Sequence, residues 1–181
     1  MTYFPLLNVD YRSLKKEPLS CKICYICRMK SILFVCHGNI CRSPMAEFVM
    51  KHLVRQAGLH DEFEIASAAT STEELGNPVY PPARQKLAEH GIGCAGKTAR
   101  QLTRADYARY DLIVAMDRNN LRNIDRLLGG DPQGKVSLLL SHAGQPHGEV
   151  ADPWYTGDFE ATWRDVLAGC TGLLKQLSHS H

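Results

Sequence analysis

Cys36, Arg42 and Ser43 have the side chains and the spacing that transfer of a phosphoryl group to a cysteine requires. A thiolate can attack phosphorus, and the planar fork of an arginine can bind two phosphate oxygens at once. A serine hydroxyl can donate a hydrogen bond to the thiolate and stabilise it as nucleophile and as leaving group. The spacing by itself is a weak signal. Cys94 and Arg100 repeat it without a following serine and without an apolar strand before the cysteine.

The segments on either side of this run favour the same chemistry. Residues 31–36 form a short, mostly apolar run, which predicts a buried parallel strand. Pro44 suits the first position of a helix, and apolar residues at helical spacing extend that helix to about residue 57. The first part of the chain therefore reads as strand, tight loop and helix.

The loop between this strand and helix has the residues of an anion-binding turn. A helix N-terminus offers unpaired N–H groups and partial positive charge, which stabilise a thiolate and a bound anion. Gly38 allows a positive φ and Asn39 tolerates one, so successive N–H groups can point at one anion. We predict that residues 36–43 bind a phosphate-sized dianion without a metal. The alternative is a buried strand-end thiol beside a surface arginine, which fits each residue singly but not the whole run.

Further along the chain, apolar runs alternate with segments of helical periodicity. The predicted strands lie at 63–67, 112–116 and 136–140, the first of them at a sheet edge, and the predicted helices lie at 81–90, 119–128 and 159–177. Strands that alternate with helices form a mostly parallel sheet covered on both faces. Ligands bind at the carboxyl ends of such strands. The sequence therefore predicts an α/β fold with its chemistry in the loop after the first strand.

The composition fits a folded protein and excludes some classes of partner. The chain of 181 residues is 44% hydrophobic and carries a formal net charge of +2. It has no run of about 18 apolar residues that indicates a transmembrane helix, and its charge is too balanced to favour nucleic acid or a membrane surface as partner. The seven cysteines are an odd number, and no signal peptide is recognisable. We therefore expect a reducing, cytoplasmic location.

The N-terminal segment differs from the rest of the chain. Residues 1–28 hold five basic and two acidic side chains, and Met29 stands before the first strand as an initiator would. We expect residues 1–28 to be a poorly ordered extension or a mis-assigned start, and residues 29–181 to form the functional domain. Three cysteines in the extension have a spacing that can contribute to a zinc or iron–sulfur site, but no fourth ligand is evident nearby. They are Cys21, Cys24 and Cys27. We predict neither a metal nor another cofactor.

The loop and its surroundings resemble the signature of the low molecular weight protein tyrosine phosphatases. The resemblance runs through residues 33–47, 67–70, 98–102, 115–117 and 152–155. It covers about residues 29–181, the expected phosphatase domain. It implies a three-layer α/β/α fold with a four-stranded parallel sheet and a phosphate-binding loop after the first strand. It also implies metal-independent hydrolysis of phosphotyrosine monoesters through a phosphocysteine intermediate.

The resemblance implies roles for the matching residues. Cys36 is the implied nucleophile and Arg42 the implied phosphate ligand. Ser43 stabilises the thiolate, and Asn39 braces the loop. The family's general acid, in an Asp-Pro turn before the last helix, falls on Asp152. A phenolate leaves poorly unless it is protonated, so an acid must reach the ester oxygen opposite the sulfur. The same carboxylate can then take a proton from the attacking water.

The predicted substrate-binding site includes further residues around this group. Trp154 and Tyr155 match an aromatic wall, which favours a long phenolic phosphate over phosphoserine. Ile40 stands where the related arginine phosphatases place threonine, and a bulky apolar side chain there favours phosphotyrosine. Glu73 stands where several family members carry an aromatic residue, and an acid there is expected to select against acidic peptides. The remaining predicted contacts are His37, Gly38 and Cys41.

Cys41 has a second implied role, because it lies close to Cys36 in the sequence. The resemblance implies that the two can form a reversible disulfide, which protects the nucleophile from over-oxidation. The alternative is a small buried thiol that supports the loop. The sequence does not decide between them.

Two other functions fit the same loop in part. A thioredoxin-coupled arsenate reductase needs a relay pair of closely spaced additional cysteines, whereas Cys94 is alone in its region. A phosphotyrosine-binding module is expected to have lost Cys36, Arg42 or Asp152, and all three are present. The expected partners are phosphotyrosine proteins and, by analogy with bacterial relatives, a tyrosine kinase.

Overall fold

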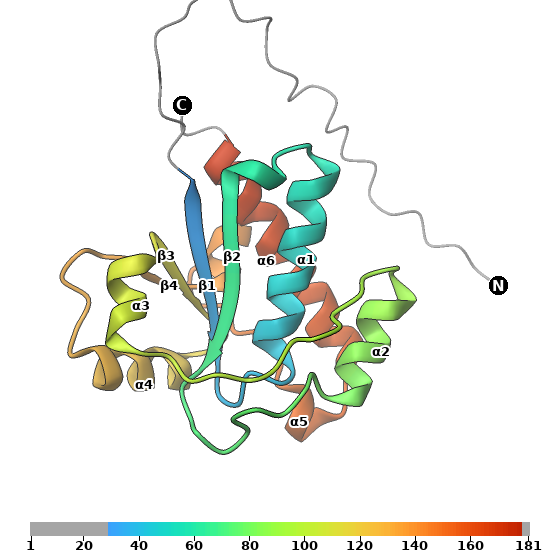
Figure 1. Cartoon of the computed structure of the whole chain (residues 1–181), viewed down its shortest axis with the longest axis horizontal. Helices are drawn as coiled ribbons and strands as arrows, with labels where there is room; N and C mark the ends of the chain where they lie inside the picture. Colours follow the sequence, from blue (N-terminus) through green and yellow to red (C-terminus); the bar gives the residue numbers. More distant parts are fainter. Residues whose placement is uncertain (1–28, 179–181) are drawn as a thin grey trace, which may run out of the picture.

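Strand β1 (Lys30–Cys36) lies inside the sheet of the computed structural model, which describes residues 29–178. Its side chains are buried from Ser31 onward, as expected of a strand covered on both faces. Strands β2 (Phe63–Ala69), β3 (Leu112–Ala115) and β4 (Val136–Leu138) complete the sheet. The sheet is four-stranded in the order β2-β1-β3-β4, and every neighbouring pair is parallel (Figure 1).

Helices form a layer on each face of this sheet. One layer contains α1 (Arg42–Gln56), α2 (Pro81–Glu89) and α6 (Phe159–Ser178), and the other contains α3 (Arg104–Arg109) and α4 (Arg118–Leu128). Successive residues of a strand point to opposite faces. Phe34 therefore packs with the α1 layer, and Leu33 and Val35 pack with the α4 layer. Cys36, two residues after Phe34, points to the same face of the sheet and ends β1 on the side of α1. The predicted three-layer α/β/α class is confirmed.

Helix α6 packs closely against the 3-10 helix η3 (Leu139–Ala143). The apolar side chains that recur at helical spacing along α6 form a stripe that is buried or partly buried. Glycine at 172 permits a close approach, because a Cβ there would lie 2.1 Å from the carbonyl oxygen of His142. The C-terminal helix is thereby fixed against the end of the sheet.

Several boundaries differ from the predictions. Helix α1 begins at Arg42 rather than Pro44, because proline is tolerated throughout the first turn, where N–H groups have no intrahelical partner. Strand β2 continues to Ala69. Strand β4 ends at Leu138, and the following leucines turn into η3 while staying buried, so their apolar run resembles a strand. Helix α3 has only six residues, too few for the apolar periodicity that marks the longer helices. The remaining short elements are η2 (His60–Glu62) and α5 (Pro153–Thr156).

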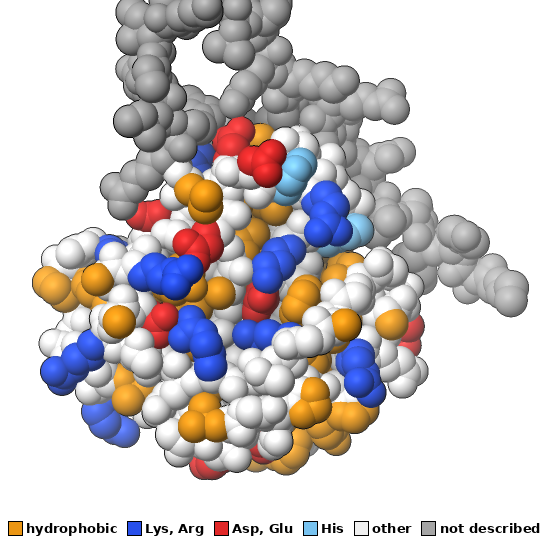
Figure 2. Space-filling view, in the orientation of Figure 1, with side chains coloured by type: hydrophobic (Ala, Val, Ile, Leu, Met, Phe, Trp, Pro, Cys, Tyr) orange, Lys and Arg blue, Asp and Glu red, His pale blue; other side chains and the backbone are white. Residues whose placement is uncertain are grey.

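The surface of the described chain is mixed in charge. Figure 2 shows lysine and arginine side chains interspersed with acidic ones on the face that carries β2. An ion pair between Arg109 of α3 and Glu64 of β2 neutralises charge locally. Within residues 29–178, the helices are too short or too polar to span a bilayer.

Candidate active site

The loop after β1 brings the thiol of Cys36 to a pocket at the carboxyl end of the sheet. Cys36 is the last residue of β1 and is 3% exposed. Its Sγ lies 3.0 Å from Oγ of Ser43, which belongs to the first turn of α1. Cys36 and Arg42 line the same pocket, whose volume is about 220 Å³. The thiol and the guanidinium therefore have access to one ligand.

The side chain of Asn39 links three parts of the site. Its Nδ2 donates to Oγ of Ser43 at 2.9 Å and to Oγ of Ser67, in β2, at 2.8 Å. Its Oδ1 accepts from the backbone N–H of Arg100 at 3.2 Å. Asn39 is 1% exposed, so these bonds form away from competing water. The loop is thereby attached to α1, to β2 and to the segment before α3.

The backbone of the loop turns at Asn39 rather than at Gly38. Asn39 has a φ of 58°, in the left-handed region, whereas Gly38 has no positive φ. Of the two residues expected to accept a positive φ, Asn39 is therefore the one that adopts it. A Cβ at position 38 would lie 3.1 Å from Cγ of Glu74, so a larger residue there would require the Glu74 side chain to shift.

Behind Asn39, the buried carboxylate of Glu47 anchors Ser67. Oγ of Ser67 donates to Oε2 of Glu47 at 2.6 Å, and Nζ of Lys97 lies 3.1 Å from the same oxygen. Lys51 binds the other oxygen. Burial lowers the pKa of Lys97, although the carboxylate of Glu47 acts in the opposite direction. A charge this deeply buried requires such partners. The network fixes Ser67 and, through it, Asn39.

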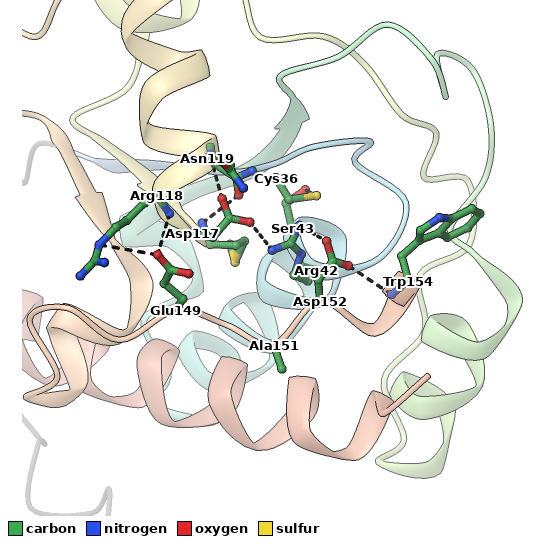
Figure 3. A network of polar contacts seen from close by, with 12 residues as sticks. Cys36, Arg42, Ser43, Asp117, Arg118, Asn119, Glu149, Ala151, Asp152 and Trp154 are labelled. Carbon is green, nitrogen blue, oxygen red and sulfur yellow. Dashed lines mark hydrogen bonds and ion pairs between the residues drawn. The ribbon is translucent and has the colours of Figure 1, made fainter. Parts of the chain in front are cut away.

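Arg42 is buried between two carboxylates. Its Nη1 donates to Oδ2 of Asp117 at 2.5 Å and its Nη2 donates to Oδ2 of Asp152 at 2.6 Å (Figure 3). Burial alone disfavours the charged form, but the nearby Cys36, Asp152 and Asp117 outweigh it and raise the pKa of Arg42. The guanidinium therefore stays charged, and its fork is held in one orientation.

Both of these carboxylates also begin helices. Asp117 is the N-cap of α4, and its Oδ1 accepts from the backbone N–H of Asn120 at 2.6 Å. Asp152 is the N-cap of α5, and its Oδ1 accepts from the backbone N–H of Trp154 at 3.1 Å. In each case one oxygen caps a helix and the other binds Arg42. Two helix starts thus position the acids around the guanidinium.

Aromatic and ionisable side chains form the rim of the pocket. Trp154 is 56% exposed and Tyr155 86% exposed, so neither packs in the core. The ring of Trp154 contacts that of Tyr80 at 5.3 Å between centroids. Nε2 of His37 lies 3.1 Å from Oε2 of Glu73. The structure therefore brings His37, Glu73, Trp154 and Tyr155 to the pocket that also holds Cys36.

Ile40 and Cys41 pack together with Ala99 in a small apolar cluster. Burial raises the pKa of Cys41 to about 12, and the neighbouring Cys36 acts in the same direction. Cys41 is therefore a thiol at neutral pH. Cys36 and Cys41 are both free thiols, and the reversible disulfide stays a prediction.

The pocket also contains residues to which the sequence patterns assign no role. They are Glu74, Asp117, Asn119, Asn120 and Asn123. The sequence could have indicated Asp117, because this residue follows a predicted buried strand. The carboxyl ends of parallel strands meet at one edge of the sheet. The others lie on a loop and a helix face that no local pattern marks.

The described chain shows no arrangement that fits a metal ion. Within residues 29–178 no group of three or more histidine, cysteine or carboxylate side chains is placed to bind one. The predictions for the extension 1–28 and its cysteines lie outside the described residues.

The fold and the pocket define a class of protein. It is a three-layer α/β protein whose loop after the first strand offers a thiol and a guanidinium to the same ligand. Comparison with known proteins identifies the family. The family model described as low molecular weight phosphotyrosine protein phosphatase matches residues 31–181.

Individual relatives agree with this match. The low molecular weight phosphotyrosine protein phosphatase of Rattus norvegicus is 41% identical over 151 residues, which cover 81% of this chain and 95% of the relative. The structure of YfkJ from Bacillus subtilis has a TM-score of 0.79 at 35% identity and covers 82% of this chain and 94% of that one. The structure of a Drosophila arginine phosphatase has a TM-score of 0.73 at 31% identity and covers 83% of this chain and 99% of that one. The chain belongs to the low molecular weight phosphotyrosine protein phosphatase family and is a phosphatase.

Proposed function

We propose that the chain is a cytoplasmic protein-tyrosine phosphatase that hydrolyses phosphotyrosine monoesters without a metal, through a phosphocysteine intermediate. Residues 29–181 form its phosphatase domain. One observation carries this proposal. Arg42 lines the same pocket as Cys36 and donates a hydrogen bond to Asp152. A phosphate group bound to Arg42 has a nucleophile and an acid in the same pocket.

In the first step the thiolate of Cys36 attacks phosphorus. The S–P bond forms as the P–O bond to tyrosine breaks, and protonated Asp152 gives its proton to the departing phenolate oxygen. Arg42 and the first N–H groups of α1 stabilise the charge on the phosphoryl oxygens. This is the positive charge that a metal ion supplies in other phosphatases.

In the second step water hydrolyses the phosphocysteine. The carboxylate of Asp152 accepts a proton from water as the water oxygen attacks phosphorus. The new P–O bond forms, the S–P bond breaks, and its electron pair returns to the sulfur of Cys36. Ser43, whose Oγ lies 3.0 Å from that sulfur, stabilises the thiolate by a hydrogen bond. Inorganic phosphate leaves and Asp152 is protonated again.

The rim of the pocket supports phosphotyrosine as the substrate. The exposed rings of Trp154 and Tyr155 can contact the ring of the substrate. Phosphoarginine is the second candidate, because an arginine phosphatase is among the similar structures. Ile40, at the position where the arginine phosphatases place threonine, favours phosphotyrosine. The proposed partners are phosphotyrosine proteins and a tyrosine kinase.

The test is hydrolysis of phenyl phosphate in the presence of a chelator. We expect the parent to be active and to be inhibited by vanadate. Cys36→Ser loses nearly all activity, while Cys94→Ser, at a buried cysteine outside the pocket, retains it. Asp152→Ala slows phenol release by on the order of 10²-fold and still binds substrate.

Three outcomes contradict the proposal. Parent-level activity in Cys36→Ser removes that residue as nucleophile. Arsenate turnover without aryl phosphate hydrolysis favours the reductase. Faster hydrolysis of phosphoarginine than of phosphotyrosine changes the substrate class.

A further inference from the structure

The segment that carries Asp152 is held by two side chains of α6. The backbone N–H of Ala151 donates to Oδ2 of Asp165 at 3.0 Å. The backbone C=O of Ala151 accepts from Oγ1 of Thr162 at 2.9 Å. Thr162 and Asp165 are three positions apart on the helix, so they lie on the same face. Figure 3 shows Ala151 between Asp152 and this helix.

The other flank of the segment is attached to the end of β3. The backbone N–H of Val150 donates to the carbonyl oxygen of Met116 at 2.8 Å. Met116 directly precedes Asp117, which binds Arg42. The segment before Asp152 is therefore attached to the end of β3 through Val150 and to α6 through Ala151.

The two polar side chains of α6 have a role distinct from that of its apolar stripe. Thr162 is fully buried, so removal of its hydroxyl leaves the carbonyl of Ala151 without that partner. Loss of a partner from a buried polar group is unfavourable. Val166 and Cys170, further along the helix, pack in the core instead. Attachment of the Asp152 segment to α6 thus depends on Thr162 and Asp165.

We propose that Thr162 and Asp165 are positioning residues that hold Asp152 in place for proton transfer, an inference that rests on the function proposed above. Both bind the backbone of Ala151 and act through it. Proton transfer requires donor and acceptor atoms within about 3.2 Å, directly or through one water. A displacement of about 1 Å can lower a rate on the order of 10²-fold. Loosening this segment affects proton donation by Asp152 more than attack by Cys36.

The test compares kcat/KM for two substrates. The leaving group of phenyl phosphate needs a proton, whereas that of 2,4-dinitrophenyl phosphate does not. In Thr162→Val and Asp165→Ala we expect kcat/KM to fall about tenfold for phenyl phosphate and by less than about twofold for the dinitrophenyl ester. The ratio of the two values is measured on one preparation and does not depend on the fraction folded. A partly unfolded variant therefore still gives an answer.

Matched variants separate positioning from stability. Thr162→Ser and Asp165→Asn keep the hydroxyl and the acceptor oxygen and are expected to keep the parent ratio. Cys170→Ala removes a buried side chain from the same helix and is expected to lower stability without changing the ratio. An unchanged ratio in Thr162→Val and Asp165→Ala overturns the proposal, even if both rates fall.

The two proposals fail in distinguishable ways. A parent that hydrolyses neither ester refutes the proposed function and this inference with it. A parent that hydrolyses both esters, with Asp152→Ala at the parent ratio, removes Asp152 as the acid and overturns the positioning role, while hydrolysis through Cys36 stands.

Discussion

Carboxylates surround the single buried arginine of the pocket. Asp117 and Asp152 bind Arg42 directly, while Glu73 and Glu74 belong to the lining. The side chain of Glu73 is 70% exposed, so it can meet residues that flank a phosphotyrosine. Repulsion of like charge is an effective means of rejecting unwanted substrates. We therefore expect the rim to favour substrates without acidic flanks.

Glu73→Gln tests this charge selection. We expect the parent to hydrolyse a phosphotyrosine peptide with lysine flanks faster than one with glutamate flanks. The variant should narrow that difference by about two- to fivefold, because exposed charge pairs interact weakly. The measurement is kcat/KM for both peptides, with phenyl phosphate as a reference without flanks. Asp61→Asn, at an exposed carboxylate in η2, is the control.

Two results contradict this prediction. One is an unchanged preference in Glu73→Gln. The other is a preference that persists at about 1 M salt, where exposed charges are screened.

The sequence predicts neighbouring residues of the site better than distant ones. Cys36, Arg42 and Ser43 lie in one run between a strand and a helix, so their proximity follows from local structure. Arg42 and Asp117 are 75 positions apart and meet only because β1 and β3 are neighbours in the sheet. Glu47 lies on a helix, where glutamate usually faces solvent. Its burial depends on Ser67 and on two lysines, and no local pattern contains that information.

At the level of elements, α3 shows that a capping motif can define a helix without an apolar stripe. The side chain of Thr103 and that of Asp106 form a reciprocal capping box. Arg100 binds both oxygens of Asp106, and its backbone N–H donates to Asn39. The helix start is thus connected to the loop. The sequence contains the capping pair, but without an apolar run the pair alone does not predict a helix.

Asp106→Ala is expected to destabilise the protein by about 1–2 kcal/mol at neutral pH, mostly through the lost cap. The ion pair adds little, because Arg100 is partly exposed and solvent screens the pair. Partial burial alone raises the pKa of Asp106, but hydrogen bonds from Arg100 and Thr103 outweigh it and lower the pKa below the usual 3.8. The stability from the charged carboxylate is therefore present above pH 3.8 and is lost as the pH falls through the lower folded-state value.

Urea unfolding of parent and variant at neutral and acidic pH measures this effect. We expect the difference in the free energy of unfolding between Asp106→Ala and the parent to be largest near neutral pH and to shrink at acidic pH. Asp125→Ala, at an exposed position of α4, is the control and should differ little from the parent. If the destabilisation caused by Asp106→Ala grows as the pH falls, the charged carboxylate of Asp106 is not the source of the stability.

For the whole molecule, parallel topology explains why one site draws on segments far apart in the chain. All four strands end at the same edge, and the loop after β1, the loop after β2 and α5 lie at that end (Figure 1). Alternation of strands and helices is enough to predict that these segments meet at one edge of the sheet. The attachment of the Asp152 segment to α6 is not predictable from the sequence, because its hydrogen bonds come from Thr162 and Asp165 in a helix whose pattern indicates only a core stripe.

A pocket assembled from distant segments exists only in the folded chain, so an oxyanion bound there stabilises the whole molecule. Vanadate at about 100 times its Kd should add about 2.7 kcal/mol to the free energy of unfolding. For a chain of this size that corresponds to a rise in Tm of about 5–10 °C. Arg42→Lys removes the fork that binds two oxygens and is expected to lose most of the rise. Arg104→Lys, at an exposed arginine of α3, should keep it. An equal rise in Arg42→Lys and the parent means that vanadate binds elsewhere, because a lysine at that depth cannot replace both bonds of the guanidinium.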